Sequence, residues 1–115
     1  MDIVFEKEYL EDLYFKVKSK DKKHRLQPEI IKAYKRCIDR LASAPNIEAL
    51  YQIHALNYEV LVGDKAGISS VRINDKYRLE FKVWEQQGEK IITLCHILDI
   101  SNHYRWNHGN DTQDL

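Results

Sequence analysis

The alternation of apolar and charged side chains over residues 77 to 83 restricts the fold more than any other feature. The segment reads Y-R-L-E-F-K-V, with an apolar residue at every odd position and a charged residue at every even position. A repeat of two is typical of a strand that buries one face and exposes the other. Asn74 and Asp75 precede it and predict a turn. We therefore expect a hairpin between residues 68–73 and this strand, with Arg78 on its wet face.

Helical periodicity dominates the first part of the chain. Apolar residues three and four apart predict amphipathic helices over residues 6 to 18 and 28 to 44. Pro28 suits the first turn of the second helix, and Pro45 stops it. Asn46 can cap a short helical turn directly afterwards.

Strand-like segments occupy the two ends of the fold. The apolar run Ile3 to Phe5 predicts a first strand. Residues 58 to 62 and 90 to 98 predict two more, and the near-continuous apolar character of the last one favours a central position. One strand, a helical hairpin and then a meander predict an α+β fold, with the helices packed on a twisted, mainly antiparallel sheet.

Length and composition indicate one cytoplasmic domain. At 115 residues the chain fits a single domain, expected over residues 1 to 106, and the polar segment 107 to 115 reads as a flexible tail. No apolar run reaches the roughly 20 residues of a membrane span, and no signal peptide opens the chain. Cys37 and Cys95 form no C-x-x-C motif, so we expect both to be reduced core residues.

Charge is unevenly distributed although the formal net charge is zero. Residues 16 to 40 hold ten Lys and Arg against three acids, whereas the first twelve residues hold five acids against one Lys. Such polarity can orient a protein on RNA. Two solvated helix faces would give the same pattern, and both interpretations stay open.

A glycine-bracketed turn, Gly63-Asp64-Lys65-Ala66-Gly67, lies just before the hairpin. The planar guanidinium of Arg78 can bind phosphate through two hydrogen bonds, and a flexible turn can bring Lys65 to the same anion. These residues predict a phosphate-binding site. The alternatives are a cross-strand ion pair for Arg78 and an ordinary exposed turn position for Lys65.

The segment from residue 56 to residue 104 resembles HigB-type toxins of the RelE/ParE superfamily. Those toxins carry a Gly-Asp-x-x-Gly turn, a strand, a short turn and an aromatic-Arg strand, as residues 63 to 81 do here. They also end in an acidic-aromatic-His segment, which here reads D-I-S-N-H-Y over residues 99 to 104. More loosely, the resemblance extends over residues 28 to 104.

The resemblance implies the toxin of a type II toxin-antitoxin system. Such a toxin enters the ribosomal A site and cuts messenger RNA without a metal or other cofactor. A base takes the proton of a ribose 2′-OH, cations hold the phosphate, and an acid protonates the departing 5′-oxygen. The implied partner is a helix-turn-helix, HigA-like antitoxin, through which the complex binds operator DNA.

The resemblance also implies which residues form the site. Arg78 matches the family arginine, and Asp99, His103 and Tyr104 stand in the terminal segment, where His and Tyr can supply acid, base or stacking. Many relatives place a His and a Lys where this chain has Glu59 and Val62. Glu59 is therefore a candidate base.

Each candidate also has a structural interpretation. Asp99 can cap the chain end, Glu59 can be a solvated strand residue, and Tyr104 can seal the core while His103 lies at its edge. His54 and His96 are read as structural. His96, Asp99 and His103 have a helical spacing on a strand end, so we expect no metal site.

Two other functions remain open on the sequence. A ParE-like toxin would use the same fold to bind DNA gyrase, because fold does not determine activity. A relative that has lost its catalytic activity would keep the fold as an interaction module, and the zero net charge favours that interpretation.

Overall fold

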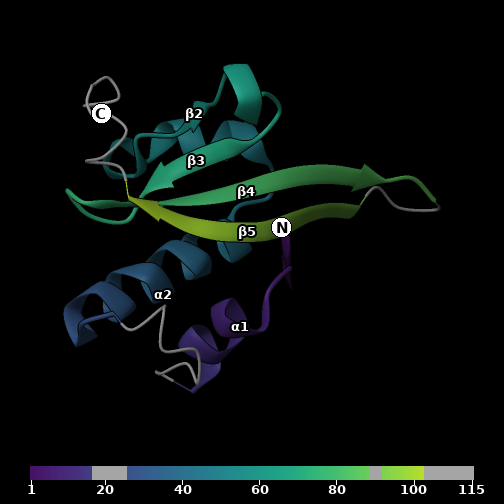
Figure 1. Ribbon diagram of the computed structural model, residues 1–115. Coiled ribbons are helices and arrows are strands. Elements are labelled where there is room, and N and C mark those ends of the chain that lie inside the picture. The colour runs from purple at the N-terminus through teal and green to yellow at the C-terminus, as the bar shows by residue number, and fades with distance from the viewer. Residues whose placement is uncertain (17–25, 89–91, 103–115) are drawn as a thin grey trace.

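The computed structural model describes residues 1–16, 26–88 and 92–102 (Figure 1). One sheet and two α-helices make up most of this part of the chain. In chain order the elements are β1 (Asp2–Phe5), α1 (Glu8–Phe15), α2 (Pro28–Ser43), η2 (Ile47–Gln52), η3 (His54–Leu56), β2 (Glu59–Val60), η4 (Gly63–Lys65), β3 (Ser69–Arg72), β4 (Tyr77–Gln86) and β5 (Ile92–Asn102), where η denotes a 3₁₀ helix.

The sheet has the strand order β1-β5-β4-β3-β2. β1 runs parallel to β5, and every other neighbouring pair is antiparallel. α1 and α2 lie on the same side of the sheet (Figure 1). This arrangement confirms the predicted α+β fold, and the internal position of β5 confirms the prediction for the last strand.

The core forms between the helices and one face of the sheet. Leu79, Phe81, Cys95 and Ile97 point to this face and are fully buried, together with the apolar stripes of α1 and α2. The hydroxyl of Tyr34 on α2 is buried too, and it donates to the Leu10 carbonyl of α1 at 2.6 Å. A buried hydroxyl needs such a partner, so this bond fixes how the two helices meet.

Turn residues set the ends of these elements as the sequence predicts. Pro28 is the first residue of α2, and the Asn46 side chain accepts the Ala49 amide at the start of η2. The Asn74 side chain accepts the backbone amides of Lys76 and Tyr77 at 2.9 and 2.8 Å, which closes the turn into β4. Side-chain acceptors of this kind replace backbone partners that a tight turn cannot supply.

The cysteine prediction is confirmed. Cys37 and Cys95 are buried and unpaired. Burial raises the pKa of Cys37 to about 11 and that of Cys95 to about 12, so neither thiol is a ready nucleophile. Among the described helices, none is long and apolar enough to span a bilayer. The expected tail, residues 107 to 115, lies outside the described residues.

Some strand limits differ from the prediction. The strand expected over residues 58 to 62 is reduced to Glu59 and Val60, because the backbone turns into η4 at Gly63, which has a positive φ of 70°. β5 continues to Asn102, four residues beyond the predicted end. It does so across a bulge, since Glu80 pairs with Asp99 while Phe81 pairs with Ile97, leaving Leu98 unpaired.

The prediction of a wet face for Arg78 is wrong. Arg78 is 3% exposed and Glu80 is 6% exposed, although both alternate with core residues. Asn57 and Lys65, which lie on either side of β2 in the chain, contact Arg78 and Glu80 respectively and help to cover them. Alternation identifies residues that share a face, but it does not reveal what covers that face.

Truncating the central strand tests this account of the core. We expect Phe81→Ala to lower the free energy of unfolding by about 3–5 kcal/mol, because it leaves a cavity beneath the helices. Val62→Ala is the control: Val62 is 81% exposed, and its loss should change stability by less than about 0.5 kcal/mol. Urea unfolding followed by circular dichroism measures both, and equal effects would contradict this account.

Candidate functional site

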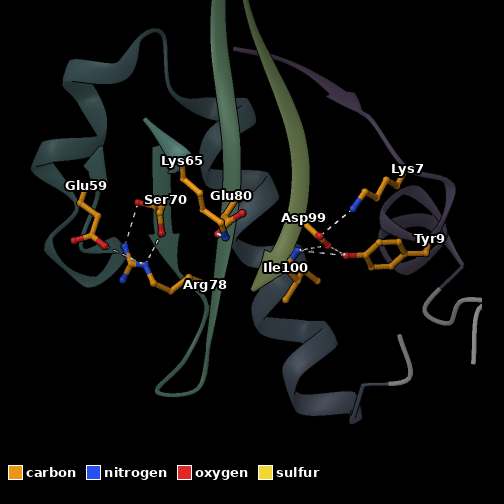
Figure 2. Close-up of polar contacts among 9 residues, drawn as sticks. All are labelled: Lys7, Tyr9, Glu59, Lys65, Ser70, Arg78, Glu80, Asp99 and Ile100. Carbon is orange, nitrogen blue, oxygen red and sulfur yellow. Dashed lines mark hydrogen bonds and ion pairs between the residues drawn. The ribbon is translucent and has the colours of Figure 1, made fainter. Parts of the chain in front are cut away.

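Polar side chains gather on the sheet face opposite the helices (Figure 2). Glu59 of β2 faces Ser70 of β3, and Ser70 faces Glu80 of β4. Facing residues of antiparallel strands point to the same side, so these three form one row. Arg78 lies on the same face, two residues before Glu80.

Arg78 is the centre of this group. Its Nε donates to the Ser70 hydroxyl at 2.5 Å, and one terminal nitrogen, Nη2, donates to the carbonyls of Asn57 at 2.7 Å and Ser70 at 3.2 Å. The other, Nη1, is buried and has no partner among the described residues. Burial lowers the pKa of Arg78 and the Glu59 charge opposes that shift, but an arginine keeps its proton in either case.

Glu59 is the acid closest to this guanidinium. Its Oε1 lies 3.7 Å from Arg78 Nε, and 49% of its side chain is exposed, against 4% for Arg78. A half-exposed carboxylate beside a buried cation is accessible to a ligand that the cation holds. The structure therefore brings the predicted base and the predicted phosphate ligand together.

Lys65 is held by an internal acid. The η4 turn that carries it requires a positive φ at Gly63 and at Gly67, 70° and 89°, which glycine adopts without strain. The Lys65 ammonium lies 2.6 Å from Glu80 Oε2, and the Glu80 side chain is only 7% exposed. Lys65 thus lies beside the Arg78 group as predicted, but it also neutralises a buried carboxylate.

Asp99 lies on the far side of β4, at the edge of β5 (Figure 2). β1 ends at Phe5, so the last part of β5 has no neighbouring strand there. Asp99 accepts the Tyr9 hydroxyl, the Lys7 ammonium at 2.9 Å and the Ile100 amide at 2.9 Å. Burial alone would raise the pKa of Asp99, but these donors outweigh it and hold the pKa below its usual value. This geometry matches the structural interpretation of Asp99.

The other predicted residues are distributed as follows. His96 Nδ1 lies 2.5 Å from Glu6 Oε2, away from Arg78. His54 is exposed on η3 and lines a cavity. His103 and Tyr104 lie outside the described residues. No cluster of three or more His, Cys, Asp or Glu that could hold a metal occurs in the part of the chain that the structure describes.

Sequence reasoning missed the residues that position the candidates. Ser70 and the Asn57 carbonyl hold Arg78, while Tyr9 and Lys7 hold Asp99. One signal was available, because Ser69-Ser70 puts two small hydroxyls inside an apolar strand. No pattern reveals a backbone carbonyl used as a ligand, as at Asn57.

Comparison with known proteins supports the resemblance. The chain matches the model of HigB-like toxins, described as the RelE-like toxin of type II toxin-antitoxin system HigB, over residues 3–103. The chain belongs to this HigB-like toxin family. Since type II toxins act in pairs with antitoxins, a cognate antitoxin is its partner.

The solved structures agree on the fold. A YoeB/ParE toxin from Agrobacterium tumefaciens is similar, with a TM-score of 0.57 and 20% sequence identity over 90% of this chain and 100% of that chain. At this identity the likeness shows the fold alone. No curated protein matches the sequence.

Acid titration tests the role of Asp99. Its folded pKa is depressed, so its contribution to this HigB-like toxin is present above the ordinary pKa of about 4 and is lost as pH falls through the folded value. We expect Asp99→Asn to cost about 1 kcal/mol at pH 7, after allowing for partial exposure, and progressively less as the pH falls below that ordinary pKa.

Urea unfolding at a series of pH values measures this difference. Asp75→Asn is the control, because Asp75 pairs with Arg72 at a 97% exposed site, where an ion pair contributes little. A cost for Asp99→Asn that stays constant down to pH 3 would refute the assignment.

Proposed function

We propose that this HigB-like toxin is a metal-independent endoribonuclease that cuts messenger RNA on the ribosome. The observation that carries the proposal is the Arg78–Glu59 pair: a buried guanidinium with an unpartnered nitrogen, and a half-exposed carboxylate 3.7 Å away. A base beside a phosphate-binding cation is what attack by a 2′-OH requires.

The reaction follows from these two groups. Glu59 takes the proton of a ribose 2′-OH, and the resulting oxygen attacks the adjacent phosphorus. Arg78 neutralises the charge that builds on the phosphate oxygens. His103 or Tyr104 gives a proton to the 5′-oxygen as its bond to phosphorus breaks. The products are a 2′,3′-cyclic phosphate and a 5′-hydroxyl.

Access to Arg78 requires a local movement. Nη1 is buried, so a phosphate reaches it once the side chains that cover it shift outward. Lys65 adds positive charge nearby when its bond to Glu80 is exchanged for one to phosphate.

Partners follow from the family and the charge pattern. The cognate antitoxin is proposed to be of the helix-turn-helix, HigA-like type, with operator DNA bound through it. The basic stretch of residues 16 to 40, which includes part of α2, offers a surface for ribosomal RNA. The protein would act in the cytoplasm, where translation takes place.

One observation favours a second function. Arg78 is covered, and Lys65 is paired with Glu80, so neither cation is freely presented. A ParE-like toxin that binds DNA gyrase would not need them free, and neither would a relative without catalytic activity. The Asp99 carboxylate is likewise already held, by Tyr9 and Lys7.

Induced expression with mapping of RNA 5′ ends tests the nuclease. Wild type should arrest growth and cut inside translated messages. Glu59→Gln should reduce cutting by about 10²–10⁴-fold, because the amide cannot accept the proton. Arg78→Lys keeps a charge but loses the planar fork, so cutting should fall strongly as well.

Lys76→Ala is the control, since Lys76 is an exposed cation in the turn between β3 and β4 and lies outside the basic stretch of residues 16 to 40. Circular dichroism of each purified variant confirms that it folds. Growth arrest with intact messages would refute the nuclease and favour gyrase. If the wild-type protein is soluble but growth does not stop, the result would favour a relative that has lost its catalytic activity.

A further inference from the structure

A cavity of about 240 Å³ lies between the 3₁₀ helices and the start of β2, and it shares Asn57 with the contacts of Arg78. Its wall combines aromatic, polar and aliphatic side chains: Leu50, Tyr51, Ile53, His54, Asn57 and Tyr58. None of these has a role in the proposed cutting reaction. A cavity that combines aromatic side chains with hydrogen-bonding groups is suited to binding a flat organic ring.

The aromatic wall is held rigidly. Tyr51 is 58% exposed, and its ring meets that of Tyr58 edge-on, with centroids 5.1 Å apart at 83°. Tyr58 is itself fixed by a hydrogen bond to Ser69 at 2.9 Å and by packing on Phe81. An exposed ring that is already ordered loses little entropy when it stacks on a ligand.

The polar wall offers unused hydrogen-bonding groups. The side chains of His54 and Asn57 are exposed and have no hydrogen-bond partner among the described residues. Asn57 ends η3 with a positive φ of 45°, a conformation that asparagine adopts more readily than most residues.

Asn57 links the cavity to Arg78. Asn57 lines the cavity, and its backbone carbonyl accepts a hydrogen bond from Arg78 Nη2 at 2.7 Å. A phosphate held by Arg78 would therefore have a neighbouring nucleotide within reach of the cavity.

We propose that this cavity binds one nucleobase of single-stranded RNA, next to the phosphate that Arg78 holds. Tyr51 stacks on the base, and Asn57 and His54 form hydrogen bonds with its edge. Proteins recognise unpaired RNA bases by this combination of stacking and edge contacts. The inference rests on the proposed function, since it places the base beside the cleavage site.

The test uses RNA that cannot be cut. The probe is a short single strand with 2′-O-methyl riboses and one central 2-aminopurine, whose fluorescence falls when it stacks on an aromatic ring. Wild type should quench the probe saturably. Tyr51→Ala should weaken binding by roughly tenfold or more, the usual effect of removing a stacking ring.

Two variants make the test specific. Tyr51→Phe keeps the ring and should bind like wild type. Phe15→Ala removes an aromatic side chain that is 65% exposed on α1, and it should bind like wild type as well. No saturable quenching by wild type, equal affinity for Tyr51→Ala, or an equal loss for Phe15→Ala would overturn the proposal.

The two proposals fail separately. Because the methylated riboses lack a free 2′-OH, base binding is measured without any cutting. Quenching that depends on Tyr51, in a protein that leaves cellular RNA intact, would support the base site and refute the nuclease. RNA cutting by a protein that does not quench the probe would support the nuclease and refute the base site.

Discussion

The burial of one guanidinium group constrains this face of the molecule more than any other contact. Moving the Arg78 charge out of water costs free energy that only well-placed acceptors can offset. Ser70 supplies its hydroxyl and its carbonyl, and Asn57 supplies a carbonyl across from them. The position of η3 and the left-handed backbone of Asn57 are thereby tied to the strand that carries Arg78, and Nη1 is left with an unused donor.

On the other side of β4, the end of β5 forms an edge that β1 leaves without a neighbouring strand. β1 is too short to cover β5, so the end of β5 would expose unpaired backbone groups, which invite association. The bulge at Leu98 and the Asp99 side chain close this edge, with Tyr9 and Lys7 as donors. The short connection from β1 to α1 brings Lys7, the residue before α1, and Tyr9 of α1 to Asp99. The geometry thus accounts for Asp99 as a structural acid.

Much of the fold follows from the sequence because periodicity reports local geometry. The alternation in β4 correctly predicted a β-hairpin, and the apolar spacing of α2 correctly predicted a helical hairpin that packs on the sheet. Burial of Arg78 was missed because its partners Asn57 and Glu59 come from a segment that forms no long regular element. The pairing of Glu59 with Arg78 depends on how that segment meets β3, so the sequence could name both residues without predicting their contact. The histidine and tyrosine expected at the end of the site stay predictions.

Charge compensation inside the site bears on how RNA would bind. Arg78 has Glu59 beside it and Lys65 has Glu80, so the group of four carries no net charge, as the whole chain does. Long-range attraction of phosphate therefore cannot come from this face, and steering would fall to the basic stretch around α2. At the site itself, phosphate has to compete with Glu80 for Lys65 and to bind Arg78 beside the Glu59 carboxylate. Binding there must gain its free energy from short-range contacts, of which stacking on a fixed aromatic ring is the kind that needs no net charge.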